Sequence, residues 1–253
     1  MKSPPWMMVA EGFAESGRLV RLDEAEARHL TGPLRRRPGD EVVLIDGAGM
    51  MARAVLRVAK SEVAEAEIVD VRVEEPPRGE GVTLAMAVVG SRAVDWAIQK
   101  AVEIGVRRVL PLVTDRTQVK SGDPSGRAEH WRRVALQALK QSHRPWAMEV
   151  ADIRPLVEVV DSDTFGPDGV VADREGVALA DLPQSAGRLL VVGPEGGFSP
   201  DEERLFADRG WPGLKLGLHV LRTETAAVVG AAMLVARDEG LLTVRGEELR
   251  VKS

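Results

Sequence analysis

Apolar and polar residues alternate over several short stretches within the first 75 residues. Residues that alternate with a period of two lie on opposite faces of a strand that is buried on one side. The strands predicted in this way are Leu19–Leu22, Glu41–Ile45, Met51–Ala59 and Val63–Val73. Strands at such close spacing, with a brief helix over Asp23–His29, predict a small β-barrel domain over residues 1–75.

A longer apolar run marks the start of a different pattern. Val82–Val89 reads VTLAMAVV, which is typical of a strand buried on both faces of a parallel sheet. Arg92–Gly105 has helical spacing and ends at a glycine, and Val109–Val113 is the next predicted strand. The polar segment 74–81, which holds two prolines and two glycines, is the predicted boundary between this domain, 80–246, and the first.

Helical and strand patterns continue to alternate through the second domain. The predicted elements are an amphipathic helix over Ala128–Ser142, a short strand region near Glu149–Ile153, a helix over Pro155–Ser162 and a strand over Gly169–Ala172. This alternation predicts the α/β class with right-handed strand–helix–strand units.

Two apolar runs near the C-terminus, Leu189–Val192 and Leu214–Leu221, each lead into a conspicuous loop and are both predicted as strands. The first loop reads GPEGG, and its three glycines allow a backbone path, including positive φ, that other residues resist. Such loops at the carboxyl ends of strands bind ligands in α/β proteins, although two ordinary turns would give the same pattern. The loop matches neither GxxxxGK[ST] nor GxGxxG.

Each loop is followed by a predicted helix. Ser199 and Glu202 have the spacing of a capping box, which predicts a helix over Pro200–Asp208. Thr223 is the predicted N-cap of a helix that includes the small-residue stretch Ala226–Ala236. Small residues allow close packing, either inside one subunit or between two.

Composition narrows the chemistry. The chain has 253 residues and no cysteine, which excludes disulfides and thiolate nucleophiles. Four histidines show no spacing typical of metal ligands, so no metal is expected. The sequence shows neither a membrane span of about 20 apolar residues nor a signal peptide, which predicts a cytoplasmic protein.

Charge alone argues against a nucleic-acid partner, but its distribution does not. The formal net charge is −5, yet basic residues cluster at Arg35–Arg37 and between Arg127 and Arg144. Phosphate binding depends on local positive potential, so these clusters fit either an RNA surface or a solvated charged face.

Specific motifs carry a family resemblance. GPEGGFSPDE followed by LGLHVLRTETAA resembles the paired loops of the SPOUT-type RNA methyltransferases, in particular the ribosomal small-subunit methyltransferase E family. The stretches Ala97–Val106 and Gln141–Arg144, with His29–Leu30, Leu34–Arg35 and Pro38–Asp40, are similar to other motifs of that family. The resemblance implies a PUA-like RNA-binding domain, a SPOUT domain with a C-terminal trefoil knot, and a homodimer. It also implies methylation of N3 of a uridine in 16S ribosomal RNA, as free RNA or in the small subunit.

The resemblance further implies a site for S-adenosylmethionine built by three segments. The residues that it assigns to the cofactor are Ala172, Gly193, Pro194, Glu195, Gly196, Gly197, Leu216, Gly217, Val220, Leu221, Arg222, Thr225 and Ala226. The residues that it assigns to RNA are Arg35, Arg36, Lys100, Gln141 and Arg144. Removal of the uracil N3 proton requires a base, and we expect Arg222 to stabilise the uracil anion and Glu224 to position it or accept the proton. The structural alternative is an Arg–Glu pair that braces the loop.

Three other functions share parts of this pattern. A SPOUT ribose 2′-O-methyltransferase would carry an NxGxxxR motif, which is absent. The second is a non-catalytic RNA-binding protein, and the third is a small-molecule enzyme that binds phosphate at the glycine loop. The intact LRTETA segment favours the methyltransferase over both. Two departures from the family pattern are Lys140, where the family has Glu, and Pro4-Pro5-Trp6, where it has Arg followed by an aromatic residue.

Overall fold

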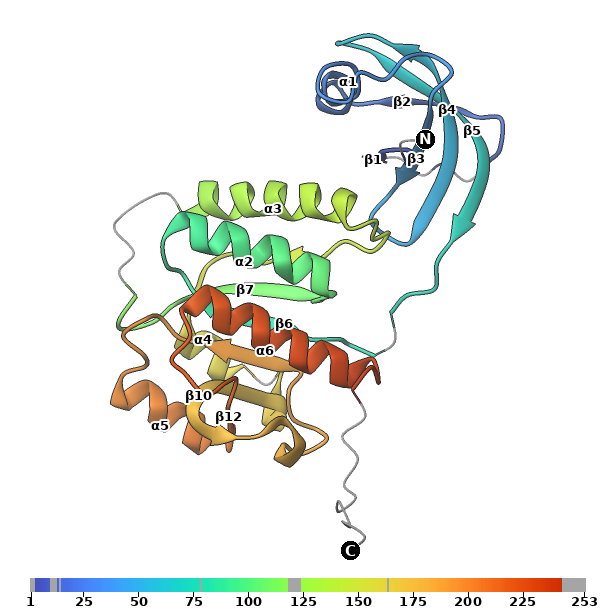
Figure 1. Ribbon diagram of the computed structural model, residues 1–253. Coiled ribbons are helices and arrows are strands. Elements are labelled where there is room, and N and C mark those ends of the chain that lie inside the picture. Colours follow the sequence, from blue (N-terminus) through green and yellow to red (C-terminus); the bar gives the residue numbers. More distant parts are fainter. Residues whose placement is uncertain are drawn as a thin grey trace, which may run out of the picture. The chain divides into compact units, whose positions relative to one another are not determined.

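The computed structural model describes residues 3–9, 13, 15–77, 79–117, 124–162 and 164–242. They form two compact units (Figure 1). The first unit comprises the chain up to Pro77 together with Ala135–Ala147, and the second comprises the remainder. The sequence pattern placed Ala135–Ala147 in the second domain, partly in the helix predicted over Ala128–Ser142, and gave no sign that it belongs with the first unit.

A curled five-stranded sheet forms the first unit. Its strand order is β1-β3-β4-β5-β2, antiparallel except where β1 runs parallel to β3. The strands are β1 (Trp6–Met8), β2 (Leu19–Leu22), β3 (Glu41–Ile45), β4 (Met50–Ala59) and β5 (Ala64–Val73), with helix α1 (Glu24–Thr31) after β2. Alternate residues of these strands are buried, as the period of two predicted. β1 was not predicted, because its three residues are too few to show a period.

The segment Ala135–Ala147 completes this first unit. Nζ of Lys140 lies 2.5 Å from Oε1 of Glu26 on α1, and both side chains are buried. The indole of Trp6 stacks on the imidazole of His143, with ring centroids 5.0 Å apart. Lys140 thus replaces the expected carboxylate, and Glu26 supplies the opposite charge at the same place.

A seven-stranded parallel sheet forms the second unit. The strand order is β12-β10-β11-β6-β7-β8, and β9 also pairs with β7. The strands are β6 (Thr83–Ala87), β7 (Arg108–Val113), β8 (Glu149–Val150), β9 (Arg154–Pro155), β10 (Gly169–Val177), β11 (Leu189–Val192) and β12 (Gly213–Leu214). Every residue of β6 and β11 is buried, which confirms the prediction from their unbroken apolar runs.

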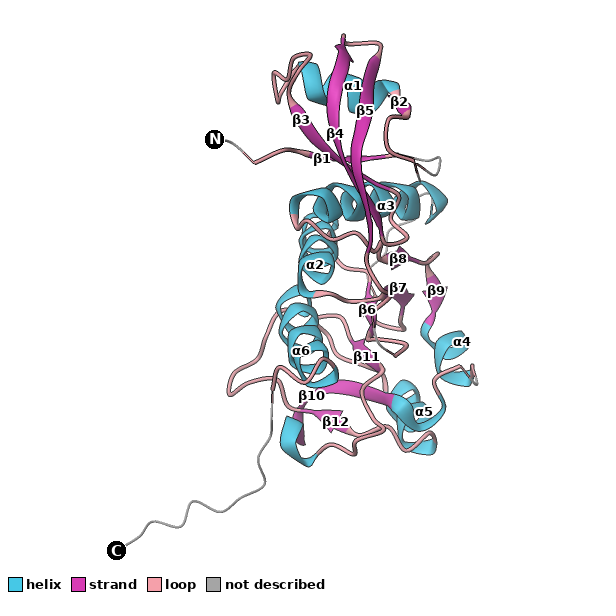
Figure 2. Cartoon of the chain, turned by 90° about the vertical axis from the view of Figure 1, so that its right-hand side faces the viewer, coloured by secondary structure: helices cyan, strands magenta, loops and turns pink. Residues whose placement is uncertain are grey.

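Helices cover both faces of the parallel sheet. α2 (Ser91–Ile104) and α6 (Thr223–Asp238) lie against one face, and α4 (Leu156–Asp161) and α5 (Pro200–Asp208) against the other (Figure 2). α3 (Pro124–Gln141) starts in this unit and ends in the first. None of the helices in the described ranges is long and apolar enough to cross a membrane.

Local signals set the ends of these helices. α2 ends at Gly105, which has φ of 106°, and α5 has the capping box of Ser199 and Glu202 that its sequence predicted. The prediction of Thr223 as an N-cap is wrong. Arg222 occupies the N-cap of α6, and its side chain makes no capping hydrogen bond. The Thr223 hydroxyl does not cap the helix either, since it donates to the Gly193 carbonyl at 3.0 Å.

The prediction of a strand over Leu214–Leu221 is also wrong in its length. β12 covers only Gly213–Leu214, and the chain then runs as a loop to α6. The reason is that two of the later apolar residues are not covered by a partner strand or a core: Leu218 is 85% exposed and Val220 is 79% exposed. Through this loop the chain passes from the face of α5 to the face of α6 (Figure 2), and the strand order agrees with the predicted SPOUT-type α/β fold.

Candidate active site

A cavity of about 250 Å³ lies beside β10 and the loops that follow β11 and β12. Its lining comes from the middle of β10, the end of β11, the loops that follow β11 and β12, and the first turn of α6: Ala172, Asp173, Arg174, Val192, Gly193, Pro194, Glu195, Gly197, Phe198, Leu216, Gly217, His219, Val220, Leu221, Thr223 and Ala226. Parallel strands direct their carboxyl ends to one edge of the sheet, where α/β proteins bind ligands. This edge is therefore the candidate site.

The glycine loop forms one wall of the cavity. Gly197 has φ of 71°, and its N–H donates to the Pro194 carbonyl at 2.9 Å, which closes a tight turn. A methyl group on Gly193 would lie 3.0 Å from the Phe198 ring. Glycine is favoured at Gly197 by the positive φ, and a side chain at position 193 would press on the Phe198 ring.

The loop between β12 and α6 forms the facing wall. Lys215 N–H donates to the Val177 carbonyl at 2.9 Å, which ties the start of this loop to β10. Nothing lies within 4 Å of a methyl group placed on Gly217, so the backbone there is open to a ligand. The exposed Val220 side chain gives the cavity an apolar rim, which suits the flat face of an aromatic base.

The structure brings most of the predicted cofactor residues together. Those that line the cavity are Ala172, Gly193, Pro194, Glu195, Gly197, Leu216, Gly217, Val220, Leu221 and Ala226. Gly196, Arg222 and Thr225 are not part of the lining. The lining residues that were not predicted are Asp173, Arg174, Val192, Phe198 and His219, although Phe198 and His219 lie inside the two family motifs. Thr223 was predicted to be a cap, and its hydroxyl instead ties the glycine loop to α6.

Arg222 and Glu224 stand at the start of α6, beside this lining. Arg222 is exposed and Glu224 is half-buried. No ion pair joins the two in the part of the chain that the structure describes, so the alternative of a bracing Arg–Glu pair is not realised. Glu224 lies in the first turn, where the helix dipole stabilises its negative charge.

The predicted RNA-binding residues are divided between the two units. Arg35, Arg36, Gln141 and Arg144 belong to the first unit, and Lys100 belongs to α2. Nη2 of Arg36 donates to the Ser3 carbonyl at 3.0 Å. Lys100 donates to both carboxylate oxygens of Glu103, at 2.7 and 2.8 Å, so part of its charge is neutralised within the helix.

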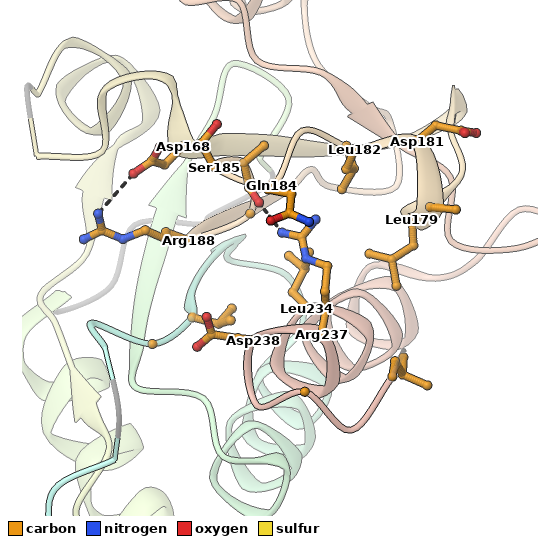
Figure 3. A pocket seen from close by; sticks show the side chains of 17 residues that line it. Asp168, Leu179, Asp181, Leu182, Gln184, Ser185, Arg188, Leu234, Arg237 and Asp238 are labelled. Atoms are coloured by element: carbon orange, nitrogen blue, oxygen red, sulfur yellow. Dashed lines mark hydrogen bonds and ion pairs between the residues drawn. The ribbon is translucent and has the colours of Figure 1, made fainter. Parts of the chain in front are cut away.

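A larger cavity, of about 1000 Å³, lies at the amino ends of β6, β10 and β11 (Figure 3). Its basic side chains are already engaged: Arg188 pairs with Asp168 at 3.1 Å, and Arg237 donates to the Ala186 carbonyl. Burial lowers the pKa of Arg237, and the negative charge of Asp238 partly offsets the effect. Because both of its arginines are engaged with groups of the protein itself, the site at the carboxyl ends remains the candidate.

The parallel sheet with two loops at its carboxyl edge is the architecture expected of a SPOUT-type RNA methyltransferase. Residues 75–235 match the family model of the RNA methyltransferase domain. The chain is 31% identical over 225 residues to the ribosomal RNA small subunit methyltransferase E of Aquifex aeolicus, covering 87% of this chain and 95% of that protein. It is also 31% identical over 253 residues to the protein of that name from Mycobacterium tuberculosis, covering 94% and 92%. The chain belongs to the ribosomal RNA small subunit methyltransferase E family.

Solved structures agree with this assignment. A ribosomal RNA small subunit methyltransferase E from Neisseria gonorrhoeae, bound to S-adenosyl methionine, superposes with a TM-score of 0.82 at 28% identity, covering 93% of this chain and 98% of that one. A Legionella pneumophila protein in complex with the cofactor SAM gives a TM-score of 0.86 at 27% identity, with the same coverage. The predicted SPOUT-type domain with a small β domain before it is confirmed.

Proposed function

We propose that this protein transfers a methyl group from S-adenosylmethionine to N3 of a uridine in 16S ribosomal RNA. Membership of the ribosomal RNA small subunit methyltransferase E family carries the proposal, because the similarity extends over nearly the whole chain. Related structures that hold S-adenosyl methionine support the choice of methyl donor. The proposed substrate places the enzyme in the cytoplasm.

The residues around the cavity fit this donor. Glycines 193 and 197 let the main chain approach a ligand, and the apolar side chains of Leu216, Val220 and Leu221 offer a wall for adenine. Thr223 is bonded to the Gly193 carbonyl and keeps the two walls together. When bound, S-adenosylmethionine supplies an electrophilic methyl group on a sulfonium centre.

The chain itself must prepare the uridine. The base must leave its pairing partners before its Watson–Crick edge can enter a site. N3 of uracil carries a proton that must be removed before it can act as a nucleophile. We assign to Arg222 the stabilisation of the uracil anion and to Glu224 its positioning or the acceptance of the proton. Both stand beside the cavity and are not paired with each other.

The proposed RNA contacts are basic and amide side chains of both units. Arg35, Arg36, Gln141 and Arg144 on the first unit, with Lys100 on α2, would bind phosphate or sugar groups and hold the ribosomal RNA in register. Such contacts give affinity without reading sequence, and they make binding depend on salt concentration.

A transfer assay tests the proposed activity. Purified protein and labelled S-adenosylmethionine are incubated with small ribosomal subunits, or with free 16S RNA, that lack uridine N3 methylation, and the nucleosides are identified by mass spectrometry. We expect label in 3-methyluridine. Label in a 2′-O-methylated nucleoside would assign the chain to the other SPOUT chemistry, and RNA binding without transfer would make it a non-catalytic RNA-binding protein.

We also propose that the protein is a homodimer formed through α6. The outer face of this helix carries apolar side chains that the rest of the described chain leaves half-exposed: Val228, Val229, Ala232 and Met233. Sedimentation equilibrium is expected to give twice the chain mass of 27.3 kDa. Val229→Glu would place a charge in this interface and is expected to give the mass of one chain. A wild-type protein that sediments as one chain at micromolar concentration excludes the dimer.

A further inference from the structure

The segment that follows β7 contacts the glycine loop. Nη1 of Arg116 donates a hydrogen bond to the Gly196 carbonyl at 2.6 Å. A methyl group on Gly196 would lie 3.5 Å from Cδ of Arg116, so the arginine side chain crosses directly over this glycine. Arg116 does not line the cavity. It therefore contacts the loop and not the space that the loop encloses.

A rigid turn carries Arg116. The Thr117 N–H donates to the Thr114 carbonyl at 3.0 Å, and the Thr114 N–H donates to Oγ1 of Thr117 at 2.9 Å. The two hydroxyl oxygens are 2.7 Å apart, and Thr114 is buried. Because the turn is fixed before any ligand binds, the arginine loses less conformational freedom when it reaches Gly196.

Glu202 fastens this turn to the helix that follows the glycine loop. Its carboxylate is buried and accepts from the Asp115 N–H at 2.9 Å through Oε1 and from the Ser199 N–H at 2.8 Å through Oε2. The Ser199 hydroxyl donates to Oδ2 of Asp115 at 2.5 Å. The turn around Arg116 and the C-terminal end of the glycine loop are thus parts of one hydrogen-bonded assembly.

The peptide between Gly196 and Gly197 is held from both sides. Its carbonyl accepts from Arg116, and its N–H donates to the Pro194 carbonyl at 2.9 Å. A peptide group is planar, so fixing the carbonyl direction also fixes the N–H direction. The other end of the loop is held by Thr223, which donates to the Gly193 carbonyl at 3.0 Å. Side chains from two different elements therefore set the loop's shape.

We infer that Arg116 is a positioning residue for binding of the methyl donor. It holds the Gly196–Gly197 peptide in the orientation that shapes the donor cavity, and it does so through Gly196 without touching the donor. The inference rests on the proposed function, because it takes this cavity to be the donor site. A guanidinium suits the role, since its charge strengthens the bond to a neutral carbonyl.

Calorimetric titration of S-adenosylhomocysteine without RNA tests the inference. Arg116→Ala is expected to weaken its binding by about tenfold, the loss that one charge-assisted hydrogen bond at a partly solvated position would cause. Arg116→Lys should recover part of the affinity, because an ammonium can donate to the same carbonyl. Amide exchange of Gly197 should be faster in Arg116→Ala than in the wild type.

The matched control is Arg204→Ala. Arg204 is an exposed arginine on α5 that pairs with Asp201 at 2.9 Å, and its removal takes away the same charge from the adjoining helix without freeing Gly196. Its affinity should stay within about twofold of the wild type.

The outcomes separate this inference from the activity on which it rests. Failure of the wild type to bind S-adenosylhomocysteine would remove the proposed function and this inference with it. Normal binding by both the wild type and Arg116→Ala, with unchanged exchange at Gly197, would overturn the positioning role alone. A loss confined to RNA affinity would make Arg116 an RNA contact and would also reject the inference.

Discussion

Replacing Lys140 with methionine is expected to lower the free energy of unfolding by about 3–5 kcal/mol, because a buried carboxylate is left without its counter-charge. Nζ of Lys140 lies 2.5 Å from Oε1 of Glu26, and the two side chains are only 5% and 7% exposed. The second carboxylate oxygen, Oε2, is buried and has no hydrogen-bond partner in the described part of the chain. The lysine is therefore the main compensation for that charge.

Urea denaturation followed by tryptophan fluorescence measures this loss, with the denaturant slope checked for constancy. Arg28→Ala, on the helix α1 that carries Glu26, is the control, because the pair of Arg28 with Glu24 is exposed and is expected to contribute less than about 1 kcal/mol. The double variant Glu26→Leu/Lys140→Met removes both charges and should recover most of the stability. Equal, small effects of Lys140→Met and Arg28→Ala would show that the pair is not buried in solution.

Arg222→Ala is expected to slow methyl transfer by about 10²–10³-fold, the usual cost of removing one group that stabilises a developing anion. The reason is that Arg222 is the one cation proposed to balance the negative charge that develops on the uracil. Single-turnover rates at saturating RNA and donor measure the chemical step. Affinity for S-adenosylhomocysteine should change by less than about twofold, because Arg222 does not line the cavity.

Arg36→Ala separates catalysis from RNA binding in the same assay. It is expected to weaken RNA binding and to lower the slope of log affinity against log salt by about one, as loss of one phosphate contact does. Its single-turnover rate at saturating RNA should match the wild type. If Arg222→Ala instead behaves like Arg36→Ala, Arg222 binds RNA and has no role in the chemical step.

The sequence predicted elements best where the chain buries its own apolar residues. The alternating strands β2 to β5 and the unbroken runs of β6 and β11 form as expected, since most of their apolar side chains lie in a core. Leu214–Leu221 misled the prediction because periodicity assumes that apolar residues are covered by protein. Two of these residues, Leu218 and Val220, are left exposed, and Val220 lines the proposed donor cavity.

Long-range partners lie beyond any local pattern. Lys140 reads as a surface residue of an amphipathic helix, yet its partner Glu26 stands 114 residues earlier in the chain. Threonine is a residue type that often caps helices, but the Thr223 hydroxyl donates to the carbonyl of Gly193, 30 residues away. The glycine loop and the helices that follow it could be predicted because their signals are contiguous, whereas the bonds that hold the loop come from separate elements.

The assignment of Ala135–Ala147 to the first unit constrains how the protein matures during translation. The five strands and α1 are all synthesised by Val73, but Lys140 and His143 emerge from the ribosome much later. Until then Glu26 has no counter-charge and Trp6 has no ring to stack on. The amino-terminal unit therefore lacks these two contacts until the chain has been made as far as His143. A fragment that ends in the segment 74–81, the boundary that the sequence predicted, would therefore lack Ala135–Ala147 of the first unit.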